Sequence, residues 1–470
     1  MQQKRSHRSI LVLALAWGAM WGQTQPASRH FVIEDITIID TNSGRALPHQ
    51  TVVIQDGKID NVLSASDFKD TRDAAVRVDG KGKFLIPGLW DMHVHQVFGD
   101  WFPNSKKIMP ALFIANGIVG VRDMGGELDQ IQEWRREIAA GTLLGPRMVV
   151  SGPMLDGPKP RFPSSVAVAT PEDGRRAVDD LKNRGVDFIK LQSLIPREAV
   201  FAIADEAHKQ GIAFEGHVPD SVRAAEASEA GQRSFEHLIG IFEGSSPLED
   251  EFLKGGKTPG KLLASYDPVR AAKLFALLAK NQTWQCPTLV WERGGNLIEE
   301  IDFAHDARAK YVPASWKDGA WREFMVAIKH DNVDDLATRR RFVEKELEVV
   351  KAMHDAGIPF LAGTDTVPGV YVFPGFSLHE ELQRFVDAGF TPLEALQTAT
   401  INPAKFLGLD SELGTVEKGK LADMVLLGAD PLDNIQNTQK IEGVFVQGRY
   451  LSRGDLDQVL AGVEAAAQER

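Results

Sequence analysis

Six side chains that can bind a divalent metal ion stand within or at the end of short apolar segments. His93 and His95 close the run 84–95 and are two residues apart. Because residues i and i+2 of a β-strand point to the same side, both imidazoles can bind one ion. One such histidine is usually an ordinary core or surface residue, so the prediction of a metal centre rests on the whole set. Its other members are Lys190, His217, His237 and Asp365.

Lys190 is the least expected member of this set. It lies in the apolar segment FIKLQ, between Ile189 and Leu191. As an ammonium group it would reach for the surface along its aliphatic stem, or would repel a bound cation. Burial lowers the pKa of a lysine, however, and a neutral amine can react with carbon dioxide. The resulting carbamate would bridge metal ions as a carboxylate does.

A scaffold of buried strands must position these residues. Eight apolar runs alternate with amphipathic helical segments such as 171–185, 196–211 and 339–357. This alternation is typical of a parallel sheet, and eight strands predict an α/β fold with a closed (β/α)8 TIM-like barrel. The candidate residues would lie at the carboxyl ends of its strands, where barrel enzymes carry their active sites. The runs are 84–95, 117–126, 146–153, 187–192, 213–218, 233–240, 283–291 and 359–365.

Both ends of the chain have a different pattern, with short β-like segments separated by turn signals. We expect these ends to pair into one small β-sandwich formed by residues 28–84 and 410–460. The barrel would then occupy residues 85–409. The segments 240–266 and 291–338 are long for simple connections, so we expect extra helices or lids there.

The N-terminus and the net charge bear on where the protein acts. Lys4, Arg5 and Arg8 precede the apolar run 10–21, which is too short to span a bilayer. We therefore expect residues 1–27 to be a cleaved signal peptide. The mature protein would be periplasmic or secreted, with no stable membrane span. The 470 residues carry a net charge of -12 without a basic stripe, which argues against a nucleic-acid partner.

Several motifs resemble one known family. The segments PGLWDMHVH, FIKLQ, EGHV, FEHLIG and AGTDT resemble the five metal-binding motifs of the amidohydrolase superfamily. The segment KLADMVLLGADPL is similar to the C-terminal return of that superfamily's small β-sandwich. The segments GVRDMGG and GTVEKGKLADMVLL are similar to the group of imidazolonepropionase-like enzymes, Xaa-Pro dipeptidases (prolidase-like) and related carboxypeptidases. The resemblance covers essentially the whole mature chain.

The resemblance implies a ligand set for two metal ions. By analogy, His93, His95 and Asp365 would bind the first ion, and His217 and His237 would bind the second. The lysine that matches Lys190 bridges the two ions as a carbamate in binuclear members. Imidazolonepropionase is mononuclear and does not use this lysine, so Lys190 favours the binuclear, peptidase-like branch. Zinc is the default metal for mixed imidazole and carboxylate ligands, and the resemblance also implies a homo-oligomer.

This ligand set implies hydrolysis of an amide or peptide bond. Two cations that share a hydroxide supply a nucleophile near neutral pH. Asp365 would accept the proton of that hydroxide during attack and then deliver it to the departing amine. The expected substrates are dipeptides, for example Xaa-Pro, or N-acyl amino acids. Hydrolysis of a cyclic amide or a lactone is the alternative, and a non-catalytic scaffold is a remote one because all six ligand positions are filled.

Candidate substrate-binding residues are fewer. A free carboxylate on the substrate calls for an arginine, and Arg122 and Arg161 follow the second and third predicted strands. Arg122 stands beside Asp123, so a structural ion pair is an equal alternative for it. Three aromatic residues after the first histidine pair could wall an apolar pocket or could equally pack within their loop. They are Phe98, Trp101 and Phe102.

Overall fold

The computed structural model describes residues 30–69, 75–162, 164–367 and 369–469. The predicted signal peptide, 1–27, lies outside the described residues. No helix within these ranges is long and apolar enough to cross a membrane.

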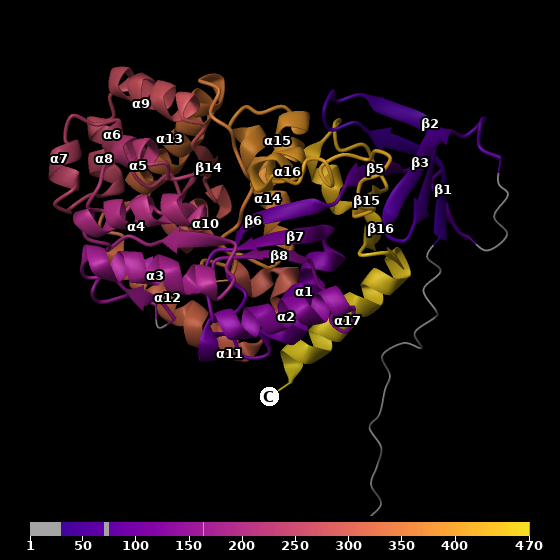
Figure 1. The fold of residues 1–470 in the computed structure, drawn as a ribbon, viewed down its shortest axis with the longest axis horizontal. Coiled ribbons are helices and arrows are strands. Elements are labelled where there is room, and N and C mark those ends of the chain that lie inside the picture. The colour runs from indigo at the N-terminus through magenta and orange to yellow at the C-terminus, as the bar shows by residue number, and fades with distance from the viewer. Residues whose placement is uncertain (1–29, 70–74, 163, 368, 470) are drawn as a thin grey trace, which may run out of the picture.

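One sheet joins strands from the two ends of the chain. Its eight strands are ordered β17-β16-β15-β5-β1-β2-β3, and β4 pairs with β1. Figure 1 shows these strands at one side of the molecule, with the indigo N-terminal strands beside β15 and β16. Inward-facing apolar residues such as Ile33, Ile54 and Leu426 form a core of their own. The strands are β1 (His30–Ile39), β2 (Ala46–Gln55), β3 (Lys58–Ser64), β4 (Val76–Asp79), β5 (Phe84–Pro87), β15 (Met424–Leu427), β16 (Ile441–Val446) and β17 (Arg449–Ser452).

The middle of the chain forms parallel strands in two groups. The first group has the order β6-β7-β8, and the second has the order β10-β9-β11-β12-β13-β14. The amide of Asp187, next to β11, donates to the carbonyl of Val150 in β8 at 2.8 Å. The four predicted histidines lie at or directly after the carboxyl ends of β6, β12 and β13, and Lys190 lies in β11. The strands of both groups are β6 (Leu89–Val94), β7 (Ile118–Asp123), β8 (Arg147–Val150), β9 (Leu155–Asp156), β10 (Val166–Ala167), β11 (Phe188–Leu191), β12 (Ala213–Gly216), β13 (Ser234–Glu236) and β14 (Trp284–Cys286).

Three of the predicted strands differ from the structure. The run 84–95 is two strands, β5 and β6, that separate at Gly88, where an added Cβ would lie only 2.2 Å from Val119. The run 283–291 is a strand only as far as Cys286, and a helix begins at Leu289. The run 359–365 forms no ladder and makes only isolated bridges at Phe360 and Thr366.

The helices between the strands agree well with the sequence patterns. The helix α3 (Pro171–Asn183) begins with a capping box on Thr170 and a proline in its first turn, which are strong start signals. The two long connections contain extra helices, as predicted. In chain order the remaining α-helices are α1 (Ser105–Ala115), α2 (Leu128–Ala140), α4 (Arg197–Gln210), α5 (Ala224–Glu229), α6 (Ile241–Gly244), α7 (Glu249–Phe252), α8 (Pro259–Ser265), α9 (Pro268–Lys280), α10 (Leu289–Asn296), α11 (Ala314–Trp316), α12 (Arg322–Asp331), α13 (Leu336–Asp355), α14 (Phe376–Asp387), α15 (Pro392–Thr398), α16 (Ile401–Leu407) and α17 (Arg453–Gln468).

Candidate metal centre and active site

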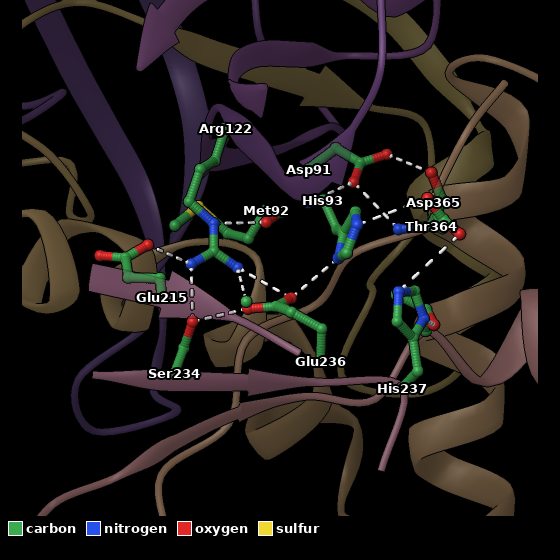
Figure 2. A network of polar contacts seen from close by, with 12 residues as sticks. Asp91, Met92, His93, Arg122, Glu215, Ser234, Glu236, His237, Thr364 and Asp365 are labelled. Carbon is green, nitrogen blue, oxygen red and sulfur yellow. Dashed lines mark hydrogen bonds and ion pairs between the residues drawn. The ribbon is translucent and has the colours of Figure 1, made fainter. Parts of the chain in front are cut away.

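Asp365 is the point at which three of the predicted histidines meet. Its Oδ1 atom lies 3.4 Å from Nε2 of His93 and 3.2 Å from Nε2 of His95. Its Oδ2 atom lies 3.9 Å from Nε2 of His237. The ring of His217 follows at 4.9 Å from that of His237, measured between centroids. The four histidines and the aspartate therefore converge on one small volume. Figure 2 shows His93, His237 and Asp365 pointing toward one another.

Three buried polar atoms at this point have no hydrogen-bond partner among the described residues. They are Nε2 of His93, Oδ1 of Asp365 and Nζ of Lys190. Unpaired buried polar atoms are costly, and they are rare unless an ion or a water completes their bonding. His237 and Asp365 also have positive φ angles of 60° and 54°, a strained conformation for residues other than glycine. These observations fit a donor set arranged for metal ions.

Lys190 lies in β11 with its side chain fully buried. Burial lowers the pKa of its amine to about 8, although the carboxylates of Glu236 and Asp365 partly oppose that shift. A larger share of the amine is therefore neutral at physiological pH than for an exposed lysine. Since only the neutral amine reacts with carbon dioxide, the environment of Lys190 favours a carbamate.

The four histidines present the same nitrogen to the centre, because each Nδ1 atom already has a partner. Nδ1 of His95 donates to the carbonyl of Gly125 at 2.9 Å. Such outer contacts fix the orientation of an imidazole and leave Nε2 free for a metal. Burial lowers the pKa of His93 and His217 well below the usual range and that of His237 to about 3. The imidazoles of His93, His217 and His237 are therefore neutral, which is the form that binds metal ions. The other Nδ1 partners are Glu236 for His93 (2.8 Å), Ser193 for His217 (2.9 Å) and Thr288 for His237 (2.6 Å).

A second group of side chains, His93, Glu236 and Cys286, also lies close enough to hold an ion. Its chemistry is less suitable. The Nδ1 atom of His93 is bonded to Glu236, and Glu236 in turn binds Arg122. Burial raises the pKa of the Cys286 thiol, so the thiolate form that binds metals is disfavoured. The group of His93, His237 and Asp365 is the better candidate.

Arg122 does not lie where a substrate could reach it, which corrects the expectation that it binds substrate. Its side chain is fully buried, and its guanidinium donates to the carbonyl of Met92 at 2.6 Å and to Glu215 at 2.7 Å. It also donates to Ser234 and to both oxygens of Glu236. Its ion pairs are therefore with Glu215 and Glu236 (Figure 2), and its sequence neighbour Asp123 is not the partner.

Glu236 connects this buried network to the metal centre, which leads to a testable prediction. We expect Glu236→Gln to weaken zinc binding by about 10- to 100-fold, because the neutral amide no longer fixes the His93 ring as a charged acceptor. Zinc affinity measured by competition with a chelator tests this. The exposed Glu229→Gln, a short distance away in the chain, is the matched control and should bind zinc as the wild type does. Unchanged zinc affinity in Glu236→Gln would contradict the role of Glu236.

Two adjoining cavities open above the centre and share lining residues that include His237, Arg161 and Glu292. The larger one, about 780 Å³, we call the aromatic lobe because four aromatic rings that contact one another line its wall. The smaller one, about 460 Å³, we call the acidic lobe because five carboxylates line it. Those rings belong to Phe98, Trp101, Phe162 and Phe324, and those carboxylates to Asp156, Asp220, Glu243, Glu292 and Glu346.

The expectations about substrate residues have mixed outcomes. Arg161 lines both lobes with an exposed side chain, so it remains a candidate. Phe98 and Trp101 line the aromatic lobe. Phe102 does not, because it is buried against Trp316, so the alternative of packing holds for it. The helix α12 supplies Phe324 from the long connection, so this segment covers the site.

Sequence reasoning missed the acidic residues that surround the ligands. Asp91, Glu215 and Glu236 are all buried on the strands that carry the histidines. Asp91 and Glu215 each stand two residues before a histidine, so strand alternation turns both side chains to the same side. That period-2 pattern of charged residues within buried strands was the available signal. Glu292 and Glu346 lie on helices α10 and α13, and their sequence patterns do not set them apart from surface glutamates.

Comparison with known proteins agrees with this geometry. A family model described as the amidohydrolase family matches residues 84–451. The ochratoxinase of Aspergillus niger is 24% identical over 459 residues, which cover 85% of this chain and 82% of the relative. The imidazolonepropionase of Vibrio parahaemolyticus is 23% identical over 451 residues, which cover 90% of this chain and 99% of the relative.

A solved structure shares the fold. The crystal structure of a Xaa-Pro dipeptidase with bound methionine in its active site superposes with a TM-score of 0.67 at 20% identity. The match covers 90% of this chain and 100% of that one. The predicted resemblance to the group of imidazolonepropionases and Xaa-Pro dipeptidases is confirmed. Because the family match spans most of the chain, this protein belongs to the amidohydrolase family and is a hydrolase.

Proposed function

We propose that this protein is an exported, binuclear metal-dependent amidohydrolase that cleaves dipeptides or N-acyl amino acids at the amide bond. The observation that carries the proposal is the convergence of the four histidines and Asp365 close to the buried, unpaired amine of Lys190. A lysine in that position is hard to explain as a structural residue. As a carbamate it would become an additional anionic ligand among them.

The proposed ligands are His93, His95, Lys190, His217, His237 and Asp365. Two divalent ions, most simply zinc, would supply Lewis acidity toward a scissile carbonyl and an activated water. The chain's own contribution is to hold and move protons and to position the substrate. Asp365 sits at the mouth of the centre with 6% of its surface exposed, so one of its oxygens can take a proton and pass it to a leaving amine.

The two lobes would hold the two sides of the scissile bond. The aromatic lobe offers rings to a bulky apolar group of the substrate. Arg161, at the junction of the lobes, would bind a substrate carboxylate through its guanidinium fork. Release of a free amino acid carrying that carboxylate would identify the reaction.

We also propose that the parallel strands close into an eight-stranded barrel beside a second domain built from both termini. Hydrogen bonds on either side of the segment 359–366 support closure. The amide of Met92 donates to Ala362 at 2.8 Å, and the amide of Leu361 donates to Gln285 in β14 at 2.9 Å. The same segment thus links the first strand β6 to the last strand β14. The single sheet from the two ends supports the second domain, 28–84 with 410–460.

Export and oligomerisation complete the proposal. The basic residues and short apolar run at the start of the chain support a cleaved signal peptide and a periplasmic or secreted protein. N-terminal sequencing of the protein recovered from its native host tests the cleavage. Light scattering of the mature protein tests the homo-oligomer.

A substrate screen on the metal-loaded enzyme tests the proposed activity. The panel contains dipeptides, N-acyl amino acids, cyclic amides and lactones, with products identified by mass spectrometry. We expect a free amino acid to be released from the first two classes. Ring opening without release of an amino acid would instead support the alternative, a cyclic amide or lactone hydrolase similar to imidazolonepropionase. No turnover in any class would overturn both.

A further inference from the structure

The acidic lobe contains two carboxylates that pair with no lysine or arginine among the described residues. Glu346 on α13 is only 2% exposed and lines the cavity, and burial raises its pKa to about 8. Glu292 on α10 lines the same cavity. Among the described residues, the basic group that comes nearest to its carboxylate is Nδ1 of His237, at 4.0 Å. The low pKa of that imidazole leaves it neutral, so it supplies no positive charge. Burial raises the pKa of the Glu292 carboxyl well above its usual range, and the nearby carboxylate of Glu346 raises it further.

Among the described residues, the lysine and the arginine that line the acidic lobe, Lys257 and Arg161, form no ion pair with Glu292 or Glu346. Lys257 donates to Asp220 at 2.9 Å and to Glu243 at 3.0 Å, so it neutralises the other side of the cavity. The guanidinium of Arg161 makes no hydrogen bond or ion pair with the pair Glu292 and Glu346 in the part of the chain described. A buried carboxylate without a partner costs free energy or takes up a proton, and a cation bound between the two glutamates would supply the missing partner.

We propose that the acidic lobe is a subsite for a positively charged organic group of the substrate, an ammonium or a guanidinium, held between Glu292 and Glu346. This inference rests on the proposed amide-cleaving function and narrows its substrate class. The lobe adjoins the metal centre through His237, so a group bound in it belongs to the molecule being cut. Its volume of about 460 Å³ is large enough for a basic side chain.

A metal ion is a poorer occupant than an organic cation. A third ligand atom close to both carboxylates would be needed, and neither glutamate belongs to a group of potential metal ligands in the described residues. A guanidinium or ammonium instead needs only acceptors, which two carboxylates supply through charge-assisted hydrogen bonds.

Three pairs of substrates that differ by one positive charge test the subsite and locate the charge. A comparison of methionyl-arginine with methionyl-citrulline tests a positive charge on the leaving side of the scissile bond. A comparison of arginyl-methionine with citrullyl-methionine tests a positive charge on the acyl side. Methionyl-methionine against its N-acetyl derivative tests the free α-ammonium. We expect the zinc-loaded enzyme to prefer the charged member of at least one pair by about tenfold or more in kcat/KM, the range of a hydrogen bond to a charged group.

Substitutions of Glu346 and Glu292 test whether these two carboxylates cause the preference for the charged substrate. Glu346→Gln should lower the preference to about one, and Glu292→Gln is a second variant should the first fail to fold. Glu344→Gln removes the same charge from an exposed position of α13 and should keep the preference. The inference is overturned if no pair favours the charged member, or if Glu346→Gln keeps the preference of the wild type.

A binding measurement separates failure of the subsite from failure of the proposed function. Calorimetry with L-arginine and L-citrulline, and with methionine and N-acetylmethionine, needs no turnover. If none of the six peptides is cut, the proposed function fails, yet tighter binding of arginine that is lost in Glu346→Gln still supports the subsite. Equal binding of arginine and citrulline excludes a side-chain cation, and equal binding of methionine and N-acetylmethionine in addition overturns the subsite whatever the enzyme cuts.

Discussion

Lys190→Ala is expected to lose at least one metal ion and more than about 10³-fold in kcat/KM, because removal of a ligand exceeds the 10- to 100-fold cost of removing an outer contact. The amine lies fully buried with no hydrogen-bond partner among the residues described, and burial brings its pKa to about 8. Without the proposed carbamate, the remaining ligands would supply one negative charge fewer to the two cations. Metal content and kcat/KM measured on the same preparation test this.

A second substitution at Lys190, a rescue experiment and a control variant test whether this side chain acts as a metal ligand. Lys190→Met keeps the length and burial of the side chain but cannot carry a carbamate, so it should behave as Lys190→Ala does. Short carboxylates such as formate should restore part of the activity of Lys190→Ala by entering the space left by the side chain. Lys257→Met, which removes a lysine from the cavity wall instead, should retain both metal ions. Full activity with two ions in Lys190→Met would exclude a bridging role.

Arg122→Met is expected to have the largest effect on stability, a loss of about 3–5 kcal/mol, because it removes the main counter-ion of two buried carboxylates. Glu215 would keep only the longer contact with Arg233, at 3.9 Å. The guanidinium is fully buried and bonds both Glu215 and Glu236. Since Glu236 also holds His93, metal binding should weaken together with stability. Guanidinium chloride unfolding of the metal-free and metal-loaded protein measures both effects.

A matched ion pair on the surface provides the comparison. Arg197 binds Glu226 through two hydrogen bonds, but 41% of its side chain is exposed. Arg197→Met should therefore cost about 1 kcal/mol or less. If Arg122→Met were as mild as Arg197→Met, the buried network would not be what supports His93. Adding Glu215→Gln to Arg122→Met should recover part of the loss, because one uncompensated charge is removed.

Local signals predicted much of the scaffold. Helix starts such as Thr170 followed by a proline combine a cap with a fixed backbone angle, and α3 begins there. The conformation of the segment 359–365 was harder to predict, because an apolar run indicates burial without showing whether a ladder of β-sheet hydrogen bonds forms. Asp365 adopts a left-handed conformation within it, and an added Cβ on Gly363 would lie 2.5 Å from the Cys286 sulfur. These restraints come from neighbouring strands and leave no trace in the local pattern.

For the candidate site, too, local patterns predicted some features, and contacts distant in sequence determined others. The side chains of the proposed ligands could be predicted from their types at strand ends, without knowledge of distant contacts. The partners of Arg122 could not, because Glu215 is 93 residues and Glu236 is 114 residues further along the chain. The sequence neighbour Asp123 was the natural guess for an ion pair, yet its side chain accepts from backbone amides. Contacts between strands decide which buried charges meet, and a single sequence does not reveal them.

Zinc stoichiometry as a function of carbon dioxide is the most direct test of the binuclear centre. Metal-free protein is titrated with zinc in buffer that contains bicarbonate and in buffer freed of carbon dioxide, with bound zinc counted per chain. The proposed carbamate on Lys190 predicts two tightly bound ions in bicarbonate and loss of at least one when carbon dioxide is absent. Two tightly bound ions in both buffers would contradict it.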